Sequence, residues 1–141
     1  YLLHSNPVLQ ALNYYVDNGN IVTADMQALF RNCIFWGEGG TVEDEVFVGK
    51  EGNNIFNIEF ETCLMKVLND PLNSTLNGII RNETPLFDSI DISNNHFDFR
   101  HRNFPFAPGI DTGSPVPMPF DLDNEPRVAG TLPDMGCYER Q

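Results

Sequence analysis

Oxygen-bearing side chains near the C-terminal end are the residues best suited to hold a metal ion. Asp121, Asp123 and Asn124 succeed one another as at the start of a calcium loop, and calcium prefers carboxylate and amide oxygens. The sixth position of such a loop is Pro126 rather than Gly, and the twelfth is Leu132 rather than Glu, so the run is not an EF-hand. Two interpretations stay open: calcium bound by Asp121 and Asp123, or a turn stabilised by its own backbone. No other cofactor is indicated.

Basic and aromatic side chains supply the second set of candidates. Arg127 is expected to pair with Asp121 or Asp134 and to stabilise that turn. Arg100 and Arg102 belong to the one dense basic cluster, and we interpret it as a ligand surface or as a solvated turn. The predicted ligand surface consists of Trp36, Arg100 and Arg102.

Two short aromatic pairs flank the basic cluster. Phe97-x-Phe99 precedes it and Phe104-x-Phe106 follows it, with the period of two that core-facing strand positions have. The solvated-turn interpretation therefore places the basic cluster between two strands. Trp36 precedes a glycine-rich run, where an indole face either stacks on a sugar ring or covers the end of the fold. No nucleophile and base stand at a recognisable catalytic spacing.

The three cysteines do not form the close pairs that zinc or redox motifs require. Cys33, Cys63 and Cys137 are far apart in sequence, and we interpret them as small buried apolar residues. Cys33 and Cys63 come together only if the fold stacks the segments that carry them. Whether they form a disulfide is left open.

Composition excludes several classes of partner. The chain has 141 residues, with 20 acidic and 8 basic side chains and a net charge of -12. Such a field repels nucleic acid and anionic lipid. No apolar run approaches the roughly 20 residues that span a bilayer. We therefore expect no nucleic-acid partner and no membrane-spanning segment in this chain.

Short apolar runs separated by Asn, Gly, Asp and Pro indicate an all-β protein with many strands. One short helix is predicted near residues 7–16, where Asn6 precedes Pro7. Phe30-Arg31-Asn32-Cys33-Ile34-Phe35 is matched thirty residues later by Phe60-Glu61-Thr62-Cys63-Leu64-Met65. That repeat favours a parallel β-helix with Cys33 above Cys63, and a compact β-sandwich is the alternative.

The composition changes at residue 105, where prolines and glycines become frequent. Residues 1–104 are interpreted as terminal β-helix coils, and residues 105–141 as a loop-rich C-terminal cap, because closely spaced prolines prevent long regular elements. Open coil ends expose unpaired backbone edges. We expect the cap to cover such an end.

Five short motifs follow one another in a characteristic order: Asn32-Cys33-Ile34-Phe35-Trp36-Gly37, Thr84-Pro85-Leu86-Phe87, residues 107–113, residues 121–127, and Pro133-Asp134-Met135-Gly136-Cys137-Tyr138-Glu139. Through these motifs, most of all those in its last third, the chain resembles a bacterial family of right-handed parallel β-helix proteins, pectin-lyase-like in fold and of the choice-of-anchor Q type. It departs from the family at Asn124, where Gly is usual, and at the proline shifted to Pro108. The motifs imply structural roles for Asp121, Arg127, Asp134 and Gly136.

The resemblance implies an extracytoplasmic bacterial protein, secreted or on the outer surface, whose partners are polysaccharide or cell-envelope components. It also implies that upstream coils of the same protein stack on this chain. Our leading hypothesis is a non-catalytic set of C-terminal coils and cap with a glycan-binding or adhesive role. The alternative is a fragment of a polysaccharide lyase or glycoside hydrolase whose active site lies upstream of residue 1. Such lyases use a Lys or Arg base, for which Arg100 and Arg102 are the only dense candidates.

Overall fold

The computed structural model describes residues 4–140, and these fold as an all-β protein without a helix. Residues 1–3 and 141, at the outer ends of the predicted coils and cap, lie outside the described residues. The strands are β1 (Leu9–Leu12), β2 (Tyr14–Asp17), β3 (Asn20–Thr23), β4 (Met26–Arg31), β5 (Ile34–Phe35), β6 (Val46–Gly49), β7 (Phe56–Glu61), β8 (Leu64–Met65), β9 (Thr75–Asn77), β10 (Ile80–Arg81), β11 (Phe87–Asp91) and β12 (His96–His101).

The helix predicted near residues 7–16 is wrong, because β1 and β2 occupy that stretch. β2 and β3 form an antiparallel hairpin in which Asp17 pairs with Asn20. The two residues between them, Asn18 and Gly19, both have positive φ, at 47° and 82°. An Asn-Gly turn of this kind matches the twist of a hairpin. The Asn-Gly turn therefore favours a hairpin here over the helix that the weak apolar pattern indicates.

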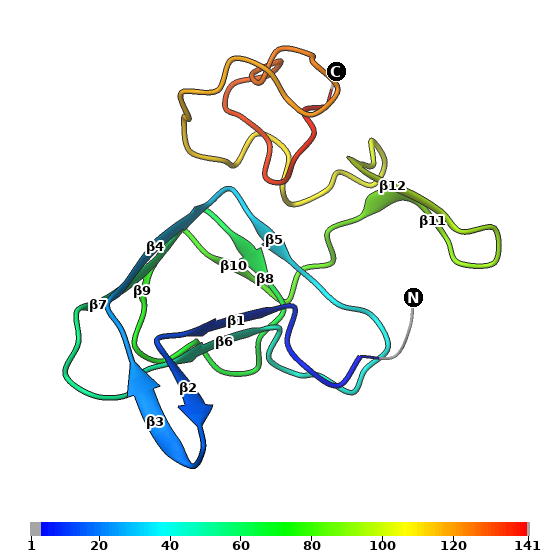
Figure 1. The fold of residues 1–141 in the computed structure, drawn as a ribbon. Helices are drawn as coiled ribbons and strands as arrows, with labels where there is room; N and C mark the ends of the chain where they lie inside the picture. The colour runs from blue at the N-terminus through cyan, green and yellow to red at the C-terminus, as the bar shows by residue number, and fades with distance from the viewer. Residues whose placement is uncertain (1–3, 141) are drawn as a thin grey trace.

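Three parallel sheets form the body of the molecule. β1 pairs with β6, β4 with β7 and then β9, and β5 with β8 and then β10. Figure 1 shows these sheets as three sides around a shared interior. The chain visits one side after another and then returns to the first, so strands distant in sequence become neighbours. The sheets hold two or three strands each, and none closes into a complete solenoid within residues 4–140.

The strand register confirms the thirty-residue repeat found in the sequence. Phe30 pairs with Phe60 in the β4–β7–β9 sheet, and Ile34 pairs with Leu64 in the β5–β8–β10 sheet. Cys33 lies directly before Ile34 and Cys63 directly before Leu64, so the two cysteines occupy equivalent positions in adjacent layers. The next layer follows after a shorter stretch of sequence, since Phe60 also pairs with Leu76. Parallel pairing ends with β10 at Arg81, ahead of the boundary predicted at residue 104.

A left-handed residue forms the corner between two of the sheets in every layer. Asn32 has φ of 56°, Thr62 of 48° and Gly78 of 63°, and each lies just after the strand of one sheet and before that of the next. A Cβ atom at Gly78 would lie 3.1 Å from Cγ2 of Thr62, so the three corners are stacked closely. Asn and Gly adopt this conformation at low cost.

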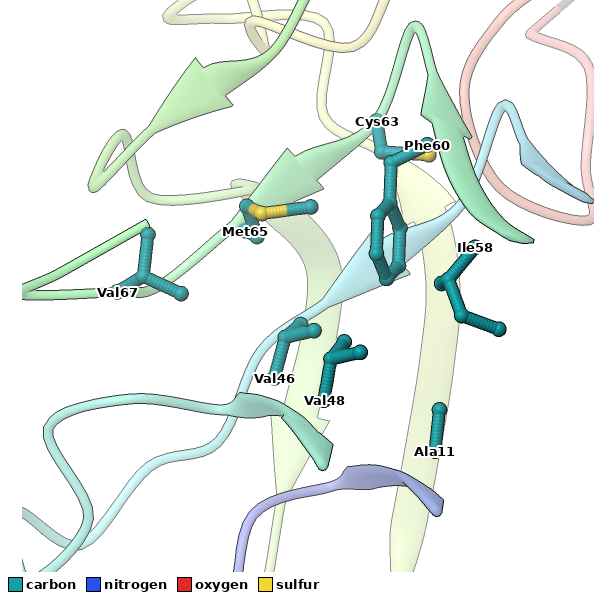
Figure 2. Packing of buried hydrophobic residues seen from close by; sticks show 8 residues of the cluster. All are labelled: Ala11, Val46, Val48, Ile58, Phe60, Cys63, Met65 and Val67. Carbon is teal, nitrogen blue, oxygen red and sulfur yellow. The ribbon is translucent and has the colours of Figure 1, made fainter. Parts of the chain in front are cut away.

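The core lies between the three sheets (Figure 2). Ile58 and Phe60 alternate with outward-facing residues along β7 and are 1% and 0% exposed. Phe60 stacks on Phe30 of the adjacent layer, with ring centroids 5.0 Å apart, and packs edge-on against Phe35. The buried cluster consists of Ala11, Val46, Val48, Ile58, Phe60, Cys63, Met65 and Val67. One layer alone leaves these side chains open, so stacking the layers is what buries them.

The C-terminal segment docks on the corner of the stack. Beyond β12, the described residues form no strand, and a single bridge joins Phe120 to Pro126. Ser114 exchanges backbone hydrogen bonds with the Asn32 side chain, donating to Oδ1 at 2.7 Å and accepting from Nδ2 at 2.8 Å. Gly136 donates to the Asn32 carbonyl oxygen at 2.7 Å. These contacts place residues 114 and 136 beside the Asn32 corner (Figure 1), and the expectation that the segment covers a coil end stays a prediction.

Candidate functional site

A groove of about 590 Å³ runs between the corner of the stack, the β11–β12 hairpin and the C-terminal segment. Its volume is within the range of ligand sites, and its walls are mostly apolar, as in such sites. The lining residues are Arg31, Asn32, Cys33, Ile34, Phe35, Trp36, Phe87, Phe99, Val116, Met118, Arg127, Gly136 and Cys137. We call it the Trp36 groove.

Trp36 is the one residue of the predicted ligand surface that lies in this groove. It follows β5 directly and is half-buried, and its Nε1 donates a hydrogen bond of 2.9 Å to Oε1 of Glu38. Phe87 and Phe99 line the groove from the β11–β12 hairpin and pack edge to face, with centroids 5.2 Å apart. Phe99 is 44% exposed. The groove thus presents several aromatic rings to whatever enters it.

Two guanidinium groups line the groove, and both have protein partners. Arg31 pairs with Glu61 at 2.7 Å, and hydrogen bonds from Arg31 and Ser114 hold the pKa of Glu61 below its ordinary value. Arg127 is 5% exposed. Its Nη2 donates to the carbonyl oxygens of Asp134 and Gly136, at 3.0 and 2.6 Å, while its Nε has no partner. The predicted pairing of Arg127 with a carboxylate is therefore replaced by bonds to carbonyls.

The basic cluster is not a solvated turn, because β12 continues through Arg100 and His101. Arg100 pairs with Asp98 at 2.9 Å and with Asp123, and it lies over the ring of Tyr138 at 4.8 Å. Arg102 donates to the carbonyl oxygen of Phe87 at 3.2 Å. Neither Arg100 nor Arg102 lines the Trp36 groove. The predicted ligand surface is therefore divided between separate parts of the molecule.

The aromatic pairs around the cluster also differ from the prediction. Phe97 and Phe99 do lie on a strand, but they are 37% and 44% exposed. Phe104 and Phe106 lie outside any strand and are 88% and 65% exposed. The β12 strand is held in a two-stranded hairpin rather than in the core, so its aromatic side chains cannot be buried on one face.

Asp121 acts as a turn residue. Its Oδ1 accepts the backbone N–H groups of Asp123 and Glu125 at 2.8 and 2.9 Å, and its Oδ2 accepts that of Glu139 at 2.8 Å. Burial acts to raise the pKa of Asp121, but these hydrogen bonds outweigh it and lower the pKa. Residues 4–140 contain no group of three or more His, Cys, Asp or Glu side chains that could hold a metal ion.

Two other carboxylates of the C-terminal segment, those of Asp134 and Glu139, also accept backbone N–H groups. Asp134 accepts the backbone N–H groups of Asp111 and Arg140, at 2.7 and 2.9 Å. Glu139 accepts that of Asp134 at 2.9 Å, and burial raises the pKa of Glu139. Gly136 has φ of 95°, and a Cβ there would lie 3.3 Å from Ile34. Asp134 thus holds backbone N–H groups of its own segment, and Gly136 adopts a left-handed conformation close to Ile34.

Sequence reasoning missed one buried charge. Glu45 belongs to an acidic run but is 0% exposed, and its carboxylate lies 2.9 Å from Nε2 of His4 and 3.9 Å from Nζ of Lys66. It also accepts the backbone N–H of Val8 at 3.2 Å. Its partners are tens of residues away, so no local pattern identifies it. The cluster connects the start of the chain to two successive layers.

Comparisons with protein-family models, with curated proteins and with solved structures found no match. The family resemblance of the C-terminal motifs therefore stays a prediction. In the part of the chain that the structure describes, no helix has the length and apolar character needed to cross a membrane.

Proposed function

We propose that the three parallel sheets are coils of a right-handed parallel β-helix. Three features support this assignment: the thirty-residue register between layers, the left-handed residue repeated at one corner, and the inward ladder of Phe30 and Phe60. Connections between parallel strands of one sheet are right-handed in about 98% of cases. The coil architecture is also what the resemblance of the C-terminal motifs implies.

The unpaired strand edges favour further coils of the same protein as a partner. β1, β4 and β5 form one layer, and each has a paired neighbour on one side only within residues 4–140. Unpaired edges of this kind are places where another strand adds. We propose that upstream coils stack here, in a bacterial protein that is secreted or held on the outer surface.

We infer that the function of this segment is to bind a glycan without catalysis, and that the Trp36 groove is the binding site. The observation that carries the inference is the groove itself, which combines the Trp36 indole with Phe99 and with apolar walls. Aromatic rings of this kind offer an apolar face together with a polar edge. The apolar face packs on the C–H groups of a sugar ring.

A glycan array followed by calorimetric titration tests the inference. Trp36→Ala is expected to weaken binding at least tenfold, equivalent to about 1.4 kcal/mol. Phe104→Ala is the matched control, because Phe104 is an exposed aromatic residue outside the groove, and it is expected to leave binding unchanged. Equal effects of both variants would refute the site. Steady release of unsaturated uronates by this segment would favour the lyase alternative instead.

A further inference from the structure

Two thiols from adjacent layers lie against each other beside the corner of the stack. Cys33 and Cys63 occupy equivalent positions, since the residues that follow them, Ile34 and Leu64, are register partners. The Cys63 thiol reaches across to the neighbouring layer and donates to the carbonyl oxygen of Phe30 at 3.4 Å. Both cysteines are free. The fold thus builds a dithiol from residues thirty positions apart.

The two thiols differ in their access to solvent. Cys33 is partly exposed and lines the Trp36 groove, whereas Cys63 is 0% exposed. A hydrogen bond from Cys63 lowers the pKa of Cys33 to about 7. The same hydrogen bond, together with burial, raises the pKa of Cys63. At neutral pH, about half of the Cys33 side chains are therefore thiolates, whereas Cys63 remains a thiol.

We propose that Cys33 and Cys63 form an oxidation site that reacts with low-molecular-weight disulfides and closes into a disulfide between adjacent layers. The Cys33 thiolate attacks one sulfur of the disulfide and expels the other as a thiolate, which leaves a mixed disulfide on Cys33. The Cys63 thiol then passes its proton to a thiolate and attacks the Sγ atom of Cys33, which expels the second thiolate. Two protein thiols are oxidised, and one small disulfide is reduced to two thiols.

The first step prepares the second. The largest cause of the raised pKa of Cys63 is its hydrogen bond to Cys33, and the charge of Cys33 adds to it. Both vanish when Cys33 enters the mixed disulfide. Adjacent parallel strands lie about 4.8 Å apart, which is within the Cα separation of about 4.4–6.8 Å that disulfides span. This chemistry is independent of whether the groove binds a glycan.

Peptide mapping after treatment with oxidised glutathione tests the proposal in the unmodified protein. The expected digest contains a peptide pair linked through Cys33 and Cys63, two hydrogens lighter than the two reduced peptides together, and the oxidised protein unfolds at a higher urea concentration than the reduced one. A peptide linked through Cys33 and Cys137 would overturn the proposal. So would a protein that keeps both thiols titratable after prolonged treatment.

Variants separate the two steps. Cys63→Ser is expected to stop at the mixed disulfide between Cys33 and glutathione, whereas Cys33→Ser is expected to form no internal disulfide and to react only at Cys137, which is exposed. Cys137→Ser is the matched control and is expected to form the internal disulfide as the unmodified protein does. Internal disulfide formation that requires Cys137 would contradict the assignment.

Discussion

Replacing Asn32 tests how the C-terminal segment is attached to the stack. Asn32 is 5% exposed and left-handed, with φ of 56°. Its side chain accepts hydrogen bonds from Thr62 Oγ1 at 2.6 Å and from the Ser114 backbone N–H at 2.7 Å, and it donates to the Ser114 carbonyl oxygen at 2.8 Å. Asn32→Gly keeps the backbone conformation accessible and removes all three contacts.

The expected loss of stability follows from those contacts. Each hydrogen bond contributes about 1 kcal/mol net, and a buried group left without a partner costs about 1–3 kcal/mol. We therefore expect Asn32→Gly to lower the free energy of unfolding by about 3–4 kcal/mol. That is a large part of the stability of a typical domain, about 5–15 kcal/mol.

Urea denaturation followed by tryptophan fluorescence measures the change, because the single Trp36 lines the groove beside this corner. Asn18→Gly is the matched control, since Asn18 is also left-handed, with φ of 47°, but lies in an exposed hairpin turn. The control is expected to change stability by less than about 1 kcal/mol. A difference between the two variants of under about 0.5 kcal/mol would refute the role of Asn32.

Three further predictions concern the core, the turn and the thiols. Phe60→Ala is expected to destabilise the protein by about 3–5 kcal/mol in urea denaturation, since Phe60 is fully buried, and a loss below about 1 kcal/mol would contradict the described core. Asp121→Ala is expected to cost about 1–3 kcal/mol, because three backbone N–H groups lose their acceptor, and calcium is expected to leave the Tm unchanged; a calcium-dependent rise would restore the metal interpretation. Alkylation of Cys33 is expected to rise with pH through a midpoint of about 7, since its thiolate is the reactive form and its pKa is lowered. Partial burial raises the pKa of Cys137, so its alkylation is expected to have a midpoint at higher pH; superimposed profiles would show the two thiols to be alike.

The sequence was sufficient to predict the layers that repeat with the same length. Phe30 and Phe60 precede cysteines at equal spacing, and the structure pairs them. The repeat does not predict the layer that carries Leu76, because this layer follows after about half that spacing and has Gly78 where the others have Asn or Thr. A fixed period cannot detect a layer that, within residues 4–140, adds no strand to the β1–β6 sheet.

The helix prediction failed for a local reason and the site prediction for a non-local one. Asn18-Gly19 fixes a hairpin, which overrides the weak pattern before it. Trp36, a candidate from the sequence, lines the groove, but Phe99 and Met118 reach the groove from distant segments. Arg100 belongs to a basic motif that is evident in the sequence, yet its guanidinium group is paired with Asp98 and Asp123. Motifs reveal which groups are present, and only the fold decides which of them meet.

The pairing of adjacent layers is the central claim, and scalar couplings across hydrogen bonds test it most directly. Stacked layers predict an NMR coupling between the amide nitrogen of Leu64 and the carbonyl carbon of Cys33, because the Leu64 N–H donates to the Cys33 carbonyl oxygen at 2.9 Å. They predict a second coupling between Ile80 and Cys63, for the same bond in the next layer, also at 2.9 Å. Couplings that connect these segments in antiparallel order, as in a β-sandwich, would contradict the stacked arrangement.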